Sequence, residues 1–360
     1  MAASLLVAFV VLEVALRFTH FRYLTHPPVA APRGYYIADA DFGADLAPNQ
    51  PPGRFWMRGP AMDVFTNQWG CFDHDEPVEE GYLLAIGDSS TWGFAALEDK
   101  WTTHLEILSE RRVLKCGVTD TGTKHQIGKA HKTIARVGVS PASILVLYDW
   151  GNDLNDDVVF PNHDVVGGIR GHTLKSLDLR TGELARLTRE EFETKYRQLR
   201  REYETFDLVR HLRTNLTTVA TFLHYCERLA LRILGPSDHS PILEHSSEVP
   251  LWRVDTDRYP WVLEAYEEHL QTLRSLHDLA ADYDAELVFI TDKIPSDGLR
   301  TQLREFVSAE FPYHVDVGPP MQERAQGRRV RYHHNSHWNA LGNRLAGEII
   351  HEYLSEAGLL

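Results

Sequence analysis

Five short apolar runs, each followed by turn residues, dominate the hydrophobic pattern of this chain. Uninterrupted apolar runs are typical of strands buried on both faces, and their alternation with helical stretches indicates a parallel sheet covered on both sides. The pattern therefore predicts an α/β fold, closed by a helix over about 340–355 whose apolar residues recur at helical spacing. The predicted strands are residues 82–86, 113–116, 143–148, 285–290 and 313–317.

The alternation of strands and helices breaks between Leu154 and Pro260. This stretch contains a hairpin-like pattern over 177–184, a charged helix from about Arg189, and a helix with an apolar stripe over 208–234. We interpret about 156–260 as an inserted helical cap over the carboxyl end of the sheet. Proline and glycine are dense over 24–60, which predicts an extended linker. We therefore expect a linker and lead-in segment over 25–80 and one domain over 81–360.

The amino terminus is strongly apolar and predicts a membrane anchor or signal segment over residues 1–24. The apolar run is slightly short of the about 20 residues that span a bilayer, and it contains Glu13, which Arg17 can offset at i+4. A buried amphipathic helix is the alternative, and a cleaved signal peptide fits less well because no basic residue precedes the run. Arg17, Arg22 and Arg33 follow it, so the positive-inside rule would keep the body cytoplasmic.

Composition narrows the functional class. The chain has 360 residues, of which 43% are hydrophobic, and a net charge of −14. This composition predicts a folded globular protein, and the acidic balance disfavours nucleic-acid binding. Cys71, Cys116 and Cys226 lie too far apart for a dense disulfide framework or a CxxC metal site, although one pair can form in an oxidising compartment.

Polar residues that suit catalysis follow the predicted strands, at the edge of a parallel sheet where ligands bind. Ser89 lies in a Gly-Asp-Ser turn after the first strand, where a helix N-terminus offers N–H groups to a developing oxyanion. Gly117 follows the second strand, and a glycine lets its N–H approach a ligand closely. Asn152 follows the third strand and offers an amide donor. His337, before the last helix, suits a general base for a serine.

The four short motifs around Ser89, Gly117, Asn152 and His337, called the first to fourth blocks below, resemble in order and spacing those of the SGNH (GDSL-type) hydrolase family. The resemblance covers roughly residues 66–354, apart from the insertion. The resemblance implies a flavodoxin-like three-layer fold, Ser89 as nucleophile and His337 as base. It also implies an oxyanion hole made by the Ser89 N–H, the Gly117 N–H and the Asn152 side chain, with no cofactor and no metal. The apolar amino terminus is typical of envelope-anchored bacterial members, which implies a periplasmic or extracytoplasmic catalytic domain, against the arginine pattern.

Two residues depart from the family pattern. Asn335 stands where the family usually has an aspartate, two residues before His337. An amide oxygen can accept the imidazole N–H but carries no charge, and in a serine-protease triad the Asp-to-Asn change lowers turnover about 10⁴-fold. Asp316 or a carboxylate from the cap is a possible substitute. Asp120 stands where the second block usually has glycine, and we expect it to cap a turn.

The leading functional interpretation is a serine esterase acting on a small ester or an O-acylated glycan. One alternative is an O-acetyltransferase of an envelope polysaccharide, which uses the same serine chemistry and differs in how it excludes water. Another is a catalytically silent binding protein, which Asn335 keeps open.

Other polar and aromatic residues have simpler explanations than a second site. His333 and His334 lack a further cluster at metal-ligand spacing, so a solvated or packing role is expected. We expect His125 and His131 on a helix surface, and Asp88 as a turn-holding residue. The acidic run of Asp153, Asp156 and Asp157 is expected to be a solvated loop. Three tryptophans either wall a pocket or belong to the core: Trp92, Trp150 and Trp338.

Overall fold

The structure, a computed structural model, describes residues 2–18, 29–57, 62–178, 180–204, 216–234, 242–243, 251–333 and 336–360. The strands are β1 (Val29–Ala30), β2 (Tyr36–Asp39), β3 (Gly43–Leu46), β4 (Gly53–Met57), β5 (Met62–Val64), β6 (Leu83–Gly87), β7 (Val113–Lys115), β8 (Ser143–Tyr148), β9 (His163–Val166), β10 (Ile169–His172), β11 (Leu174–Asp178), β12 (Glu183–Arg186), β13 (Ile242–Leu243), β14 (Glu286–Thr291) and β15 (His314–Asp316). The helices are α1 (Ala2–Arg17), α2 (Ser89–Trp92), η2 (Leu97–Asp99), α3 (Trp101–Ser109), α4 (Thr123–Val137), α5 (Asp153–Val158), α6 (Arg189–Glu204), α8 (Thr217–Leu234), η4 (Leu251–Arg253), α9 (Trp261–Asp282), α10 (Leu299–Glu310), α11 (Gly318–Ala325) and α12 (Ala340–Glu356).

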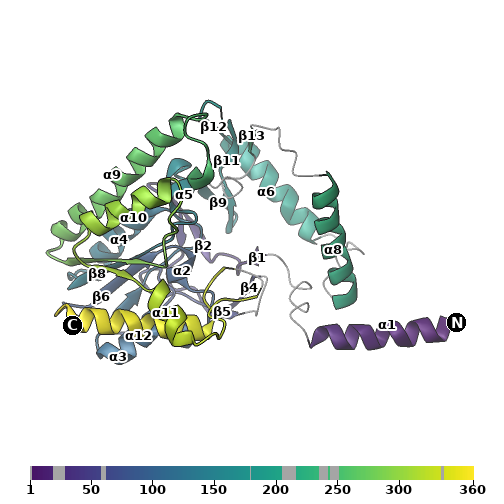
Figure 1. The fold of residues 1–360 in the computed structure, drawn as a ribbon, viewed down its shortest axis with the longest axis horizontal. Helices are drawn as coiled ribbons and strands as arrows, with labels where there is room; N and C mark the ends of the chain where they lie inside the picture. The colour runs from purple at the N-terminus through teal and green to yellow at the C-terminus, as the bar shows by residue number, and fades with distance from the viewer. Residues whose placement is uncertain are drawn as a thin grey trace.

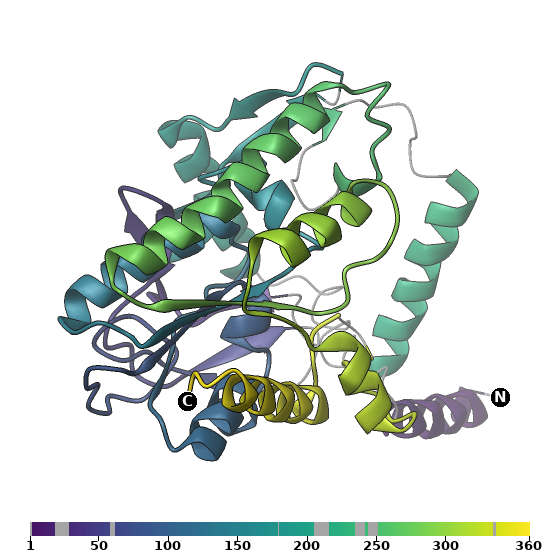
Figure 2. The same ribbon diagram turned by 60° about the vertical axis from the view of Figure 1, so that its left-hand side comes forward.

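A five-stranded parallel sheet forms the centre of the protein, in the order β15-β14-β8-β6-β7. Helices α4, α9 and α10 cover one face, and α3, α11 and α12 cover the other (Figures 1 and 2). The strands are buried on both faces: Leu84 and Ile86 belong to the core on the α4 side, and Leu83 and Ala85 to the core on the α3 side. The predicted three-layer α/β fold is confirmed.

The strand order places a topological switch point between β6 and β8. Counted along the chain within this sheet, the strands lie in the order 2-1-3-4-5, which is the flavodoxin-like order. The connection from β6 leads outward to β7, whereas β8 lies on the other side of β6. A crevice opens at the carboxyl ends of two strands whose connections diverge in this way, and ligands bind there. Ser89 begins the short helix α2 two residues after β6, at this position.

The segment predicted as an extended linker is folded where the structure describes it. Two antiparallel pairs, β2–β3 and β4–β5, form in it, and β1 adds to β4. Buried Tyr35, Leu46 and Phe55 pack with Trp92 of α2 in a third hydrophobic cluster. Prolines and glycines punctuate hairpins as well as linkers, so the linker interpretation was wrong for these residues. This cluster therefore packs against α2, the helix that begins at Ser89.

The insertion between α5 and α9 contains strands as well as helices. The predicted hairpin over 177–184 is formed by β11 and β12, and the predicted charged helix is α6, Arg189–Glu204. A second hairpin, β9–β10, precedes them and contacts β2 and β3. Of the apolar-striped helix expected over 208–234, the described part is α8, and residues 208–215 lie outside the described residues.

The amino-terminal segment forms the 16-residue helix α1, and the predicted pairing of Arg17 with Glu13 is present at 2.8 Å. The Glu13 carboxylate also accepts from the backbone N–H groups of Thr217 and Thr218, at the start of α8. Helix α1 therefore lies against the amino-terminal end of α8 (Figure 1). Within the ranges that the structure describes, no helix has both the length and the apolarity needed to cross a membrane.

Candidate active site

Ser89 and His337, 248 residues apart in the chain, meet at the carboxyl edge of the sheet. His337 Nε2 lies 2.9 Å from Ser89 Oγ. The imidazole ring packs against Phe94, with 4.0 Å between ring centroids. Ser89 as a whole residue is 7% exposed, so most of it is screened from water. A serine hydroxyl within hydrogen-bond reach of an imidazole is the geometry of an activated nucleophile.

Asp88 is the second group in contact with the Ser89 hydroxyl. Its Oδ2 lies 3.0 Å from Ser89 Oγ, and its Oδ1 accepts from the Ser90 N–H at 2.8 Å, which caps α2. The predicted turn-holding contact is thus present. Burial, together with the negative charge of Asp149, raises the pKa of Asp88 well above its usual range. The fully buried carboxyl of Asp88 is therefore harder to ionise than that of an exposed aspartate.

Gly117 lies in direct contact with the helix that carries Ser89. A Cβ atom at this position would stand 2.3 Å from the Trp92 nitrogen and 2.7 Å from the Thr91 carbonyl carbon. No residue with a side chain fits such an approach without moving the backbone. The Val118 N–H donates to the Gly87 oxygen at 3.1 Å, which continues the β6–β7 pairing to this point. The structure therefore brings the second block against the first, as the sequence motifs require.

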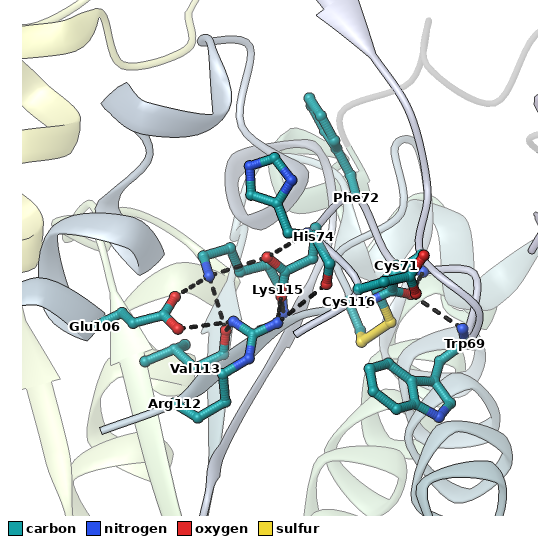
Figure 3. A network of polar contacts seen from close by, with 12 residues as sticks. Trp69, Cys71, Phe72, His74, Glu106, Arg112, Val113, Lys115 and Cys116 are labelled. Carbon is teal, nitrogen blue, oxygen red and sulfur yellow. Dashed lines mark hydrogen bonds and ion pairs between the residues drawn. A yellow bond between two sulfur atoms is a disulfide. The ribbon is translucent and has the colours of Figure 1, made fainter. Parts of the chain in front are cut away.

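Buried ion pairs anchor β7, the strand that ends just before Gly117. Arg112 binds the Asp73 carboxylate at 2.7 Å and the Glu106 carboxylate at 2.8 Å. Lys115 binds Asp73 at 3.2 Å and also contacts Glu106, so two cations share two carboxylates (Figure 3). Lys115 and Asp73 are almost completely buried, and a mutually paired network of this kind is costly to break. The network keeps the end of β7 in place.

A disulfide joins Cys71 to Cys116, the residue directly before Gly117 (Figure 3). The sequence allowed one pair without showing which, and Cys226 remains a free, exposed thiol. The bond ties the lead-in segment to the carboxyl end of β7.

The disulfide is expected to contribute strongly to stability because it closes a loop with a sequence separation of 45 residues. Loop-closure entropy for that length predicts that Cys71→Ser with Cys116→Ser lowers the free energy of unfolding by about 4 kcal/mol. Urea unfolding under non-reducing conditions measures this, with Cys226→Ser as the matched control. A loss of less than about 1 kcal/mol in the double variant would contradict the expectation.

Asn152 is the N-cap residue of α5, after β8, and its side chain is hydrogen-bonded to a residue of that helix. Its Nδ2 donates to Asp156 Oδ2 at 2.8 Å. The preceding turn is closed by Asp149, whose Oδ1 accepts from the Gly151 N–H at 2.8 Å and whose Oδ2 lies 3.5 Å from Ser90 Oγ. This last contact links the third block to the first. The sequence did not single out Asp149, although it directly follows a strand and faces the same edge.

Asp292, at the carboxyl end of β14, holds the block that carries His337. Its carboxylate accepts from the Trp338 indole N–H at 2.8 Å and pairs with Arg331, which in turn donates to the Ser336 oxygen. A carboxylate directly after a predicted strand was a usable signal, but the sequence analysis did not use it. Two residues of this block lie outside the described residues, His334 and Asn335, so the role expected of Asn335 remains a prediction.

Several side chains lie differently from the sequence expectations. The expected solvated run of Asp153, Asp156 and Asp157 is buried, because each carboxylate accepts hydrogen bonds from other elements. His125, expected on a helix surface, is buried against the Ala44 oxygen at 2.7 Å, and burial lowers its pKa to about 4. Asp120 is exposed at a turn with φ of 52°, as expected for a turn residue.

The tryptophans divide between core and site edge. Trp92 and Trp338 are buried and bonded to Tyr35 and Asp292, so they pack the core rather than wall a pocket. Trp150 is half-buried and donates to the backbone oxygen of Asp292 at 3.1 Å.

Asp316, a possible substitute for the aspartate that the family usually has before the histidine, accepts from the backbone N–H groups of Lys293 and Gly318. Across the described part of the chain, no group of three or more histidine, cysteine or acidic side chains is arranged to hold a metal ion.

No protein-family model and no curated protein matches the chain. Among solved structures, it is similar to a protein assigned to the lipolytic G-D-S-L family from Desulfitobacterium hafniense, with 12% identity, coverage of 76% of this chain and 100% of that chain, and a TM-score of 0.39. It is also similar to a G-D-S-L family member from Veillonella parvula, with 12% identity, coverage of 76% of this chain and 96% of that chain, and a TM-score of 0.37. A third similar structure is a variant of an acetyl-xylooligosaccharide esterase from Geobacillus stearothermophilus, with 12% identity, coverage of 79% of this chain and 97% of that chain, and a TM-score of 0.36. At this level of similarity, any activity has to be inferred from the Ser89–His337 geometry.

Proposed function

We propose that this protein is a serine hydrolase that cleaves ester bonds, acting on a small ester or an O-acylated glycan. The observation that carries the proposal is the 2.9 Å contact between His337 Nε2 and Ser89 Oγ at the switch point of the sheet. Ligands bind at that point in open parallel sheets. A serine and a histidine brought together there from opposite ends of the domain support acyl transfer more than a packing role.

The proposed reaction has two halves. His337 takes the Ser89 proton while Oγ attacks the ester carbonyl, and the oxyanion is held by the N–H groups of Ser89 and Gly117 and by the Asn152 amide. The tetrahedral species then expels the alcohol, which receives the proton from His337. Water, activated by the same histidine, releases the acid from the acyl-enzyme at Ser89.

Asp88 determines which way the Ser89 proton points. An ionised Asp88 would compete with His337 for the single hydroxyl proton, because both lie within hydrogen-bond reach of Oγ. Ser89 Oγ donates to Asp88 Oδ2 in the structure, but burial and the charge of Asp149 raise the pKa of Asp88, which weakens this carboxyl as an acceptor for the proton. The Ser89 hydroxyl is then left to donate to His337, as nucleophilic attack requires.

Labelling with a fluorophosphonate tests the proposal directly, because the reagent phosphonylates an activated serine. The full-length protein is expected to be labelled at Ser89, with labelling abolished by Ser89→Ala and retained in Ser90→Ala. A folded protein that is not labelled and does not cleave a short-chain aryl ester would refute the proposed hydrolase activity and favour a catalytically silent binding protein.

Asn152→Ala is expected to reduce kcat for an aryl ester by about 100-fold, the cost of losing one oxyanion donor. KM should change little, because the interaction strengthens only when the oxyanion forms. Steady-state kinetics with Asn155→Ala as a neighbouring control measures the effect. Near-normal turnover would remove Asn152 from the oxyanion hole.

We also propose that the catalytic domain works outside the cytoplasm. The Cys71–Cys116 disulfide supports this location, because such bonds persist in oxidising compartments and are kept reduced in most cytosols. Cell fractionation followed by thiol trapping checks it. A cytoplasmic protein with both thiols reduced would refute the proposed location.

A further inference from the structure

A buried pair of side chains, Asp156 and Asn162, connects the two loops that carry the proposed oxyanion donors. Asp156 Oδ2 accepts from Asn152 Nδ2 at 2.8 Å, and Asp156 Oδ1 accepts from Asn162 Nδ2 at 3.0 Å. Asn162 Nδ2 also donates to the backbone oxygen of Asp120 at 3.0 Å, in the loop that follows Gly117. The chain of contacts therefore runs from one donor loop to the other through the first residues of the insertion.

The hairpin β9–β10 of the insertion holds the same loop from a second direction. Arg170 donates to Thr119 Oγ1 at 2.7 Å and to the backbone oxygens of Thr119 and Asp120 at 2.5 and 3.2 Å. Its guanidinium lies 4.8 Å above the ring of Tyr36, whose hydroxyl is 2.9 Å from Thr119 Oγ1. The loop after Gly117 is thus clamped between the insertion and the lead-in segment. Displacement of that loop would have to break several hydrogen bonds at once.

We propose that Asp156 and Asn162 are positioning residues for the proposed esterase, and that the ionised Asp156 keeps the Asn152 amide aligned with the Gly117 loop. The inference rests on the proposed function. An ionised carboxylate offers one acceptor oxygen to each amide. It therefore fixes Asn152 with Nδ2 towards Asp156 and leaves the second Nδ2 hydrogen for the oxyanion. A protonated Asp156 presents a donor to one of these amides, and the alignment is lost.

The surroundings of Asp156 make this switch accessible near neutral pH. Burial and the charge of Asp120, with a contribution from Asp157, raise the pKa of Asp156 to about 7, against the lowering effect of the two amides. Asp88 of the nucleophile turn and Asp153 of α5 also interact with it, and Arg170 of β10 pairs with Asp120 at 3.5 Å. Activity is therefore expected to rise with pH through about 7, as Asp156 loses its proton.

The same ionisation opposes stability. Because the folded pKa of about 7 lies above 3.8, the ordinary pKa of an aspartate, the folded protein holds this proton in a range where the unfolded chain has released it. The contribution of Asp156 to stability is therefore full below the unfolded pKa and falls as pH rises through the folded pKa. The working form of the site is the less stable one.

A double-mutant cycle separates positioning from general structural support. Asp156→Asn is expected to lower kcat for an aryl ester about 10-fold at pH 8.5, with KM nearly unchanged. In the Asn152→Ala background the same change should cost less than about twofold, because there is no amide left to align. Asp157→Asn, an equally buried neighbour that contacts His269 instead, should cost the same in both backgrounds.

The pH profile supplies a second readout. The ratio of wild-type to Asp156→Asn kcat should shrink towards one as pH falls from 8.5 to 5, because wild-type Asp156 is then protonated. Taking the ratio cancels any effect of pH that is common to both proteins. Equal losses in both backgrounds, or a ratio independent of pH, would overturn the inference while leaving the hydrolase intact. Absence of Ser89-dependent turnover in wild type would instead overturn the proposed function, and thermal unfolding checks that each variant is folded.

Discussion

Replacing Ser89 with alanine is expected to reduce kcat for a short-chain aryl ester by about 10⁴-fold or more. The expected loss is large because the Ser89 hydroxyl lies between an imidazole and a carboxyl. Ser89 Oγ lies 2.9 Å from His337 Nε2 and 3.0 Å from Asp88 Oδ2, whereas Ser90 Oγ lies 3.5 Å from Asp149 Oδ2. Without the nucleophile, the acyl-enzyme cannot form, and only the weak background from binding and the oxyanion donors remains.

Ser90→Ala is the matched control for this experiment, because it removes a hydroxyl from the adjacent residue of the same turn. It is expected to retain most of the activity. Initial rates measured over a range of ester concentrations give kcat and KM for the three proteins. Comparable turnover in Ser89→Ala and wild type would show that another group performs the chemistry.

Replacing His337 with glutamine is expected to reduce kcat by a similar factor, about 10⁴-fold. Glutamine can still form a hydrogen bond with Ser89 Oγ, but it cannot take the hydroxyl proton and return it to the leaving alcohol. The change therefore isolates proton transfer from packing. The Asp292 contacts with Trp338 and Arg331 should keep the loop in place.

His333→Gln serves as the control, since His333 is exposed and lies in the same loop. Fluorophosphonate labelling of His337→Gln should slow in parallel with ester turnover, because both reactions need an activated Ser89. Normal labelling with lost turnover would assign His337 to a later step, such as deacylation. Normal values for both would remove it from the proposed mechanism.

The buried acidic residues show where local sequence reasoning failed. A run of Asp153, Asp156 and Asp157 resembles a solvated loop because like charges close together are normally exposed. In the fold, Asp157 contacts His269, 112 residues away, and Asp156 contacts Asn162 of the insertion. The partner of Asp157 lies far outside any local pattern, and the partner of Asp156 is close in sequence but reaches it only through the turn that follows α5.

The linker interpretation failed for a related reason. Dense prolines and glycines indicate turns, but turns occur in linkers and in tight hairpins alike. Linkers and hairpins differ in whether the apolar side chains between the turns, such as Tyr35 and Phe55, are buried. These residues are buried against Trp92, and that surface exists only once α2 has folded onto the sheet.

The sequence by itself determined the sheet, the final helix and the position of the four polar blocks after strands or before a helix. Strand and helix periodicities are local properties, so apolar runs such as 143–148 suffice to predict them. The strand-end rule then directs attention to Ser89, Gly117 and Asn152. Only the tertiary structure decided the 2.9 Å contact of Ser89 with His337, the choice of Cys71 as partner of Cys116, and the contact of Asp156 with Asn152 and Asn162. The first two depend on distances between residues far apart in the chain, which only packing sets. The contacts of Asp156 join residues close in sequence, and they depend on how the chain turns around α5.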